Sequence, residues 1–243
     1  MFNLNKLCKA IATSVLAVSM LSSIATADVF DDKSKAEIEK IVDEYVSNHP
    51  EVIIKAMKKL EAQEMAKQQA AISDTVSLLR SNKDLPSVGK SDAKHFIIDF
   101  YDFNCGYCKV MEPLFEKALK DYDLQIVYVN IPVIKDESKQ LAVVGQAIFN
   151  LDQKAYFKFH KHYMQPGHLP MDTDAIKASV EDSGISWDKV VKEMESGRPQ
   201  KQIGMNIKYS ADLKVAGTPY LIIDGHEVRG AITNYNRLKA ELD

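Results

Sequence analysis

Two cysteines separated by two residues, Cys105 and Cys108, carry the clearest chemistry in the sequence. The aromatic and β-branched run 95–103 precedes them and a helical pattern follows, so we expect the pair where a buried strand gives way to a helix. The amides and dipole at a helix N-terminus stabilise an anion, which favours a Cys105 thiolate with a lowered pKa. Cys108, one turn further on, is placed to attack a mixed disulfide formed on Cys105. The spacing therefore predicts thiol–disulfide exchange, with Cys105 as nucleophile and Cys108 as resolving thiol.

Two other uses of this pair compete with redox chemistry. A purely structural disulfide would close a very small loop and restrain little of the unfolded chain. A zinc site normally needs four ligands, and the only close histidine pair, His160 and His162, lacks the usual finger spacing. Metal handling by Cys105, Cys108 and one of these histidines is kept as an alternative, but we predict no metal and no cofactor.

The N-terminus has the pattern of a secretory signal peptide, which we assign to residues 1–27. A short segment with two lysines and no acid precedes the apolar run 10–24, and Ala25-Thr26-Ala27 then supplies a small-x-small cleavage pattern. The run of about 15 residues is shorter than the roughly 20 of a spanning helix, although an uncleaved anchor is the alternative. Cleavage would remove the third cysteine, Cys8, and leave one cysteine pair in the periplasm, an oxidising compartment.

The composition excludes several classes of protein. Of 243 residues, 46% are hydrophobic and 27% charged, with a formal charge of −3. These values exclude a disordered polymer, a collagen-like repeat, a cysteine-dense scaffold and a strongly basic nucleic-acid binder. We therefore expect a globular protein with no nucleic-acid partner.

Residues 28–90 form a separate helical region in the sequence. From Lys33 to Lys83 there is no glycine and only one proline, Pro50, which suits the first turn of a second helix. The first helix carries an apolar stripe at helical spacing, made of Ile38, Ile41, Val42, Tyr45 and Val46. Two such helices bury too little surface to form a core alone. We predict homo-oligomerisation through this region, with a helical arm folded back on its own domain as the alternative, and a linker over 84–94.

Residues 91–243 predict an α/β domain. Strand, helix and strand between 95 and 131 form a βαβ unit with a parallel strand pair. Helical segments follow, among them 140–151, 153–164, 172–182 and 187–195. Asp224-Gly225 predicts a tight turn between strands 220–224 and 226–230, and a last helix covers 234–242.

The cysteine motif, the long helical insert and Gly217-Thr218-Pro219 before the last hairpin resemble the DsbA family of secreted thioredoxin-fold proteins. The resemblance covers residues 93–243. It implies a thioredoxin fold with a large helical insertion, preceded here by the all-α region. It also implies a cis bond at Pro219, with Thr218 facing the redox pair and pairing with a bound peptide. Only X-Pro bonds adopt cis at low cost, and a proline that opens a strand needs no ladder donor; a trans turn proline is the alternative.

An acid six residues before the nucleophile also matches the family, and Asp99 occupies that position. Between apolar neighbours it should be buried with a raised pKa, and so be able to exchange a proton with Cys108. Asp102 is the rival acid, for which the strand alternation allows a solvent-facing position.

The residues between the cysteines and the residue before Pro219 are more similar to isomerases than to oxidases. Gly106-Tyr107 and Thr218 depart from the proline-histidine and valine of the DsbA oxidases and are more similar to secreted DsbC-type isomerases. We expect Gly106, Tyr107, Thr218 and Pro219 to contact substrate. Ser47–Val52 resembles, more loosely, extensions of DsbA-like surface or outer-membrane antigens, which adds association with the outer membrane or surface as a further location.

The predicted function is therefore a periplasmic thiol–disulfide oxidoreductase that forms, reduces or isomerises disulfides in cysteine-containing exported proteins. Isomerase or reductase activity is preferred over oxidase activity. A membrane redox partner would recharge the pair. The alternative is a non-enzymatic periplasmic chaperone or surface-associated binding protein.

Overall fold

The computed structural model describes residues 31–167 and 170–243, so the predicted signal peptide lies outside it. The chain divides into two compact units, one ending at Glu61 and the other running from Ala62 to Asp243. The long helix α2 (Glu51–Ser81) contributes its first residues to one unit and its remainder to the other. No helix in the described ranges is long and apolar enough to cross a bilayer.

The first unit contains α1 (Asp32–Asn48) and the start of α2, as the helical patterns predict. The Asp31 carboxylate caps α1 by accepting a hydrogen bond from the Ser34 amide at 2.7 Å. None of the residues of α1 is buried. Large apolar side chains on both helices are exposed, among them Ile38, Ile41, Val42, Tyr45, Ile53, Ile54, Met57 and Leu60.

The second unit is built on a five-stranded sheet in the order β1-β3-β2-β4-β5. The strands are β1 (Ser87–Val88), β2 (His95–Tyr101), β3 (Leu124–Asn130), β4 (Tyr220–Ile223) and β5 (His226–Arg229). Strands β2 and β3 pair in parallel, and the other pairs are antiparallel. The predicted βαβ unit and the predicted hairpin at Asp224-Gly225 are both confirmed.

The linker predicted over 84–94 is wrong in part, because β1 lies within it and pairs with β3. Leu85 is fully buried, and Gly89 has φ +87° with its Cα so close to the Leu124 carbonyl that a Cβ would meet the oxygen at 2.0 Å. Ile72 and Leu79, at the C-terminal end of α2, join the core on the same side of the sheet. The sheet unit therefore begins inside α2, well before residue 91.

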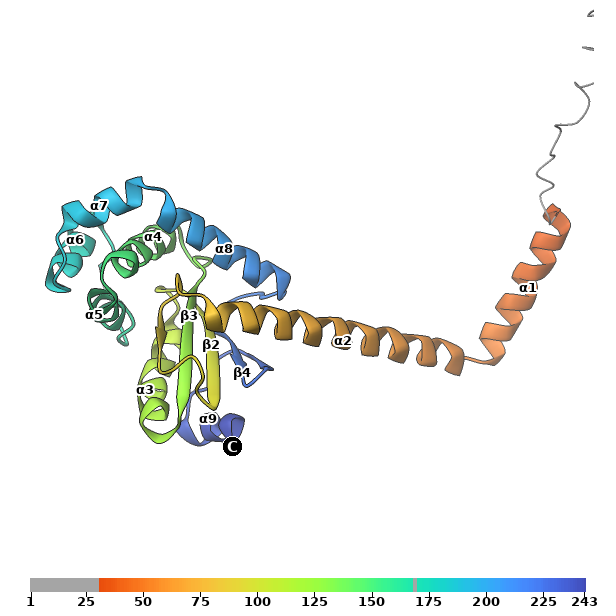
Figure 1. Cartoon of the computed structure of the whole chain (residues 1–243). Coiled ribbons are helices and arrows are strands. Elements are labelled where there is room, and N and C mark those ends of the chain that lie inside the picture. The colour runs from red at the N-terminus through yellow and green to blue at the C-terminus, as the bar shows by residue number, and fades with distance from the viewer. Residues whose placement is uncertain (1–30, 168–169) are drawn as a thin grey trace, which may run out of the picture. The chain divides into compact units, whose positions relative to one another are not determined.

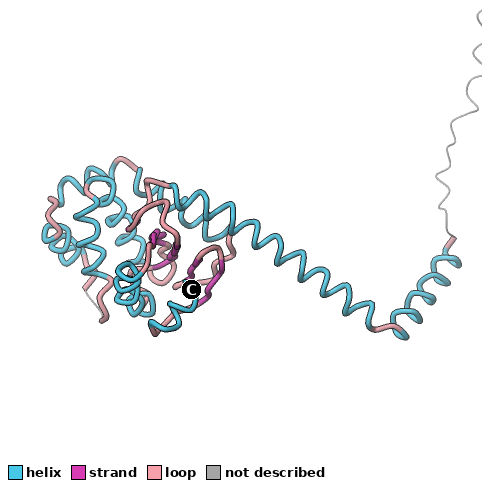
Figure 2. The backbone as a smooth tube through the Cα atoms, turned by 60° about the horizontal axis from the view of Figure 1, so that its bottom comes forward, coloured by secondary structure: helices cyan, strands magenta, loops and turns pink. Residues whose placement is uncertain are grey.

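The alternation of β2 separates two cores. Ile98 and Phe100 face the core that contains Leu79, whereas Ile97 and Tyr101 face the core formed with α3 (Gly106–Asp121) and most of the remaining helices. Those helices are α4 (Asp136–Leu151), α5 (Gln153–Tyr163), α6 (Thr173–Asp182), α7 (Trp187–Glu195), α8 (Arg198–Asp212) and α9 (Tyr235–Leu242). In Figure 1, α3 runs alongside the strands while α4 to α8 gather at one end of them, and Figure 2 shows the same grouping from a second direction.

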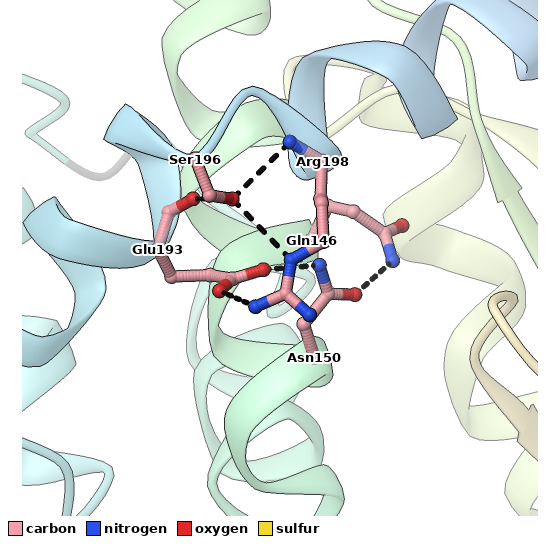
Figure 3. A network of polar contacts seen from close by, with 5 residues as sticks. All are labelled: Gln146, Asn150, Glu193, Ser196 and Arg198. Carbon is pink, nitrogen blue, oxygen red and sulfur yellow. Dashed lines mark hydrogen bonds and ion pairs between the residues drawn. The ribbon is translucent and has the colours of Figure 1, made fainter.

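Gly197-Arg198-Pro199 interrupts the helical pattern, as expected. The same residues also start α8, a helix whose bounds the sequence did not predict. Gly197 adopts φ 75° at the end of α7, and Pro199 occupies the first turn of α8, where no backbone donor is needed. Figure 3 shows the polar network at this junction. Glu193 accepts hydrogen bonds from Asn150 on α4 and from Arg198 on α8, and so joins three helices of the insert.

Leu79→Ala is expected to destabilise the sheet unit by about 2–5 kcal/mol, because Leu79 is fully buried against the sheet. The matched control is Leu78→Ala: Leu78 is 58% exposed on the same helix, and its loss should change the free energy of unfolding by less than about 0.5 kcal/mol. Urea unfolding followed by circular dichroism measures both. Equal midpoints for the two variants would contradict the packing of α2 described above.

Candidate active site

Cys105 and Cys108 lie where the sequence predicts, at the transition from β2 to α3. Cys105 is the N-cap residue of α3, and its Sγ accepts a hydrogen bond from the Cys108 amide at 3.1 Å. The two residues form a disulfide with Cα atoms 5.2 Å apart, and both are almost completely buried. On reduction, the Cys105 sulfur would lie at the positive end of the helix dipole and next to a free amide donor, which favours the thiolate.

The bond between Thr218 and Pro219 is cis, as the resemblance implies. Tyr220, the first residue of β4, pairs with Phe100 near the end of β2. Pro219 therefore lies at the edge of the sheet formed by the carboxyl end of β2, from which the chain continues to Cys105. The Pro219 carbonyl accepts a hydrogen bond from the Gly230 amide. Thr218 Oγ1 is buried and has no hydrogen-bond partner in the described residues. The register thus brings residues 105 and 219 to one edge despite their separation in sequence.

Asp99 is buried in the middle of β2, as predicted, with only 2% of its surface exposed. It lies two residues from Ile97 and two from Tyr101, on the same face of β2, and therefore faces the core that contains Cys108. Its Oδ1 has no hydrogen-bond partner among the residues that the structure describes, and burial raises the pKa of this carboxyl to about 8. An acid with this pKa can both accept and release a proton near neutral pH.

The expectation that Asp102 could face solvent is wrong. Asp102 is fully buried, because β2 ends at Tyr101 and strand alternation does not extend to the next residue. Its carboxylate accepts four hydrogen bonds of 2.7–2.9 Å, from the amides of Asn104, Val133 and Ile134 and from the Ser138 hydroxyl. Its carbonyl accepts the Cys105 amide at 2.8 Å. Asp102 therefore fixes the loop that places Cys105.

The surface beside the disulfide is apolar and accessible. Gly106 and Tyr107 lie exposed in the first turn of α3, with Tyr107 66% exposed. Val133 and Ile134, whose amides bind Asp102, are also exposed. The sequence analysis missed these two residues, since only the Asp102 hydrogen bonds bring their loop to the redox pair.

The metal alternative receives no support from the geometry. His160 is buried among aromatic rings, including Tyr101 and Tyr128, and burial lowers its pKa to about 3. His162 is exposed on the same helix. Within 31–167 and 170–243, no three His, Cys, Asp or Glu side chains gather as a metal site would require.

Asp99→Asn is expected to stabilise the folded protein at neutral pH by a few kcal/mol, at about 1.4 kcal/mol per unit of pKa shift. The raised pKa means that the folded state holds the proton more tightly than the unfolded state does. The contribution of Asp99 to stability is therefore complete below its ordinary pKa of 3.8 and is lost as the pH rises toward about 8. Urea unfolding from pH 4 to 8.5 should show a steep loss in the wild type and in the exposed control Asp74→Asn, and a smaller loss in Asp99→Asn, where Glu112 remains as a second buried acid with a raised pKa. Parallel stability curves for all three proteins would contradict the burial of a titrating acid.

Comparisons with known proteins agree with this geometry. Residues 81–243 match the family model described as thioredoxin, and residues 35–67 match that of the copper resistance protein ScsC N-terminal domain. A probable disulfide bond formation protein D from Bacillus anthracis is 24% identical over 168 residues, which cover 65% of this chain and 76% of that protein.

Two solved structures share the fold. A linker-deletion mutant of ScsC from Proteus mirabilis superposes with a TM-score of 0.64 at 23% identity, covering 89% of this chain and 97% of that one. The thiol-disulfide exchange protein α-DsbA2 from Wolbachia pipientis gives a TM-score of 0.64 at 23% identity, covering 72% and 93%. With the thioredoxin model matching two thirds of its length, and a cysteine pair capping α3 opposite a cis-proline, the chain belongs to the thioredoxin family as a DsbA-like thiol–disulfide oxidoreductase.

Proposed function

We propose that this enzyme exchanges disulfides with cysteine-containing exported proteins in the periplasm. The observation that carries the proposal is the Cys105–Cys108 disulfide at the start of α3, at the same sheet edge as the cis Thr218–Pro219 bond. The signal-peptide pattern of residues 1–27 supports export. A membrane redox partner would restore the oxidation state of the pair after each turnover, and the same export route gives access to the outer membrane or surface.

The cysteine pair and Asp99 would share the catalytic roles. In the oxidising direction, a substrate thiolate attacks Cys105 Sγ, the Cys105–Cys108 bond breaks, and the Cys108 thiolate that leaves takes a proton from Asp99. In the opposite direction, the Cys105 thiolate attacks a substrate disulfide and releases one substrate thiolate. Asp99 then accepts the Cys108 proton while Cys108 attacks Cys105 and releases the second substrate thiolate.

Substrate would lie along the edge that carries the pair. The main chain of Thr218 makes no backbone hydrogen bond within the described residues, so it is free to pair with an extended peptide. Gly106 offers no side chain to obstruct that peptide, and nothing lies within 4 Å of where its Cβ would be. Pro219 and the exposed ring of Tyr107 border this path, and Val133 and Ile134 add apolar contacts for unfolded segments.

Isomerase or reductase activity is the direction that we favour. Gly106-Tyr107 and Thr218 support it through their similarity to the secreted isomerases. The match of residues 35–67 to an ScsC N-terminal domain supports a separate role for the first helices.

We further propose that residues 28–90 join copies of the chain. In the apolar stripe of α1, Ile41 is 65% exposed and Tyr45 is 54% exposed, and no α1 residue is buried. A second copy offers the same stripe, so the two faces would be self-complementary. Two redox units held in one assembly could act on one scrambled substrate.

Cys105→Ser is expected to abolish both the reactivation of scrambled ribonuclease and the oxidation of a reduced dithiol peptide, because the sulfur that attacks a substrate disulfide, or is attacked by a substrate thiolate, is lost. Cys108→Ser should instead accumulate mixed disulfides with substrate, detected by non-reducing electrophoresis and mass spectrometry. Wild-type protein that oxidises peptide quickly but does not reactivate ribonuclease would contradict the preferred direction. Full activity of Cys105→Ser in cells would favour the non-enzymatic chaperone or binding protein.

The double variant Ile41→Asp/Tyr45→Asp is expected to reduce the solution mass of the mature protein to that of one chain, because charges replace the apolar stripe. Light scattering coupled to gel filtration measures the mass. The matched control is Glu37→Gln/Glu39→Gln, which changes exposed residues of the same helix outside the stripe and should keep the wild-type mass. A single-chain mass for the wild type would end the assembly proposal.

A further inference from the structure

A cavity of about 410 Å³ lies between α3, α5 and the sheet. This volume falls within the roughly 300–1,000 Å³ of typical small-molecule pockets. Neither cysteine of the redox pair lines the cavity, so it is separate from the site of disulfide exchange. Its wall is largely apolar and includes Val88, Pro113, Leu119, Tyr128, Phe157 and Met164.

Aromatic rings form much of this wall. The rings of Tyr128 and Phe157 meet edge to face with their centres 6.3 Å apart. The ring of His160 lies 4.7 Å from that of Tyr128. Met164 adds a thioether, which packs favourably on aromatic rings. Because aromatic rings attract one another in tilted and edge-to-face arrangements, the wall favours a ligand with an aromatic body.

Two buried polar atoms in the lining have no partner in the part of the chain that the structure describes. They are Glu112 Oε1 and His160 Nε2, which are 3.7 Å apart, too far for a hydrogen bond. Unpaired polar atoms are costly to bury. One oxygen atom about 2.8 Å from each of them would pair with both. The Glu112 side chain is 15% exposed and has rotatable bonds, so it can turn to admit that atom.

The charges around the cavity favour a neutral ligand. Burial raises the pKa of Glu112, and the charges of Asp99 and Glu116 raise it further. Lys161 lowers this pKa by less, so the neutral carboxyl is favoured. Burial lowers the pKa of His160 to about 3, and its ring is therefore neutral. At the exposed rim, the Lys161 ammonium is already paired with the Glu116 carboxylate at 2.7 Å.

A hydroxyl group suits the two unpaired atoms. A neutral carboxyl can donate or accept a hydrogen bond, and a neutral imidazole nitrogen does one or the other according to its tautomer. A hydroxyl donates one hydrogen bond and accepts up to two, so it fits either tautomer. A carboxylate only accepts and an ammonium only donates. Water could make the same bonds, but it would leave the apolar wall without contacts.

We propose that this cavity is a binding site for a small neutral phenol. The phenol ring packs against Tyr128, Phe157 and Met164. Its hydroxyl lies between Glu112 and His160 and gives both a hydrogen-bond partner. The site is independent of the proposed disulfide exchange, because none of these side chains takes part in the thiol chemistry.

The probe for the test is p-cresol, titrated into the full mature protein with isotope-labelled methionine methyl groups. The ring current of the bound phenol should shift the Met164 methyl signal in a saturable way, with a dissociation constant of about 1 mM or lower. Met205 on α8 lies outside the cavity lining, so its signal is the internal control and should not shift. Met164→Leu and Met205→Leu assign the two signals.

A matched set of probes and variants tests the polar contacts. The hydrocarbon p-xylene replaces the hydroxyl of p-cresol by a methyl group and should bind about tenfold more weakly or worse, because it leaves both polar atoms unpaired. The anion p-toluate and the cation p-methylbenzylammonium should also bind at least about tenfold more weakly. Glu112→Met should reduce the preference for p-cresol over p-xylene to about threefold or less. Glu116→Gln, at the rim of the same cavity, should keep the preference. Thermal unfolding confirms that each variant is folded.

Several results would overturn the proposal. One is a Met164 signal that does not shift with p-cresol, and another is equal binding of p-cresol and p-xylene by the wild type. An unchanged preference in Glu112→Met would exclude the proposed hydroxyl contact. Tighter binding of p-toluate would make the cavity an anion site. Tighter binding of a Gly-Tyr-Gly peptide than of p-cresol would assign the cavity to a tyrosine of a polypeptide instead of a small molecule.

Discussion

The Asp102 carboxylate is the interaction on which the geometry of the site depends. It accepts four hydrogen bonds, from the loop before Cys105, from the loop after β3 and from Ser138 on α4, while the Asp102 carbonyl accepts the Cys105 amide. A buried carboxylate is costly unless its oxygens are satisfied, and here donors from two parts of the chain satisfy them. The same contacts bring Val133 and Ile134 beside the redox pair. One side chain thus fixes both the position of the nucleophile and part of the surface that a substrate would contact.

Asp99 is the opposite kind of buried acid. Its Oδ1 has no partner within 31–167 and 170–243, its pKa is raised to about 8, and the folded state is destabilised at neutral pH as a result. Such a cost is typical of functional sites, where a proton must be held or released near neutral pH. Glu112 and His160 extend this pattern toward a cavity. The core on the α3 side of the sheet therefore combines aromatic packing with several buried polar atoms that have no partner among the described residues, and the other core also contains one, the Tyr220 hydroxyl.

Much of the sheet unit follows from local pattern. The run 95–101 is a strand because its residues are aromatic and β-branched, and 106–121 is a helix because its apolar residues recur at helical spacing. Strand β1 could not be predicted in this way, since a two-residue strand has no periodicity and depends on its partner β3. Likewise, Pro199 and Gly197 indicate that a helix ends near them. Whether a new helix follows depends on the contacts of Glu193 with Asn150 and Arg198.

The sequence by itself determined the redox pair, its place at the start of a helix, the buried Asp99 and the separate character of the first helices. Spacing and composition suffice for these because each depends on neighbours within one or two turns. Only the tertiary structure decided that Asp102 is buried, that α2 continues into the sheet unit, and that Glu112 and His160 face one cavity. These depend on contacts between residues tens of positions apart, and such contacts leave no periodic pattern in a single sequence.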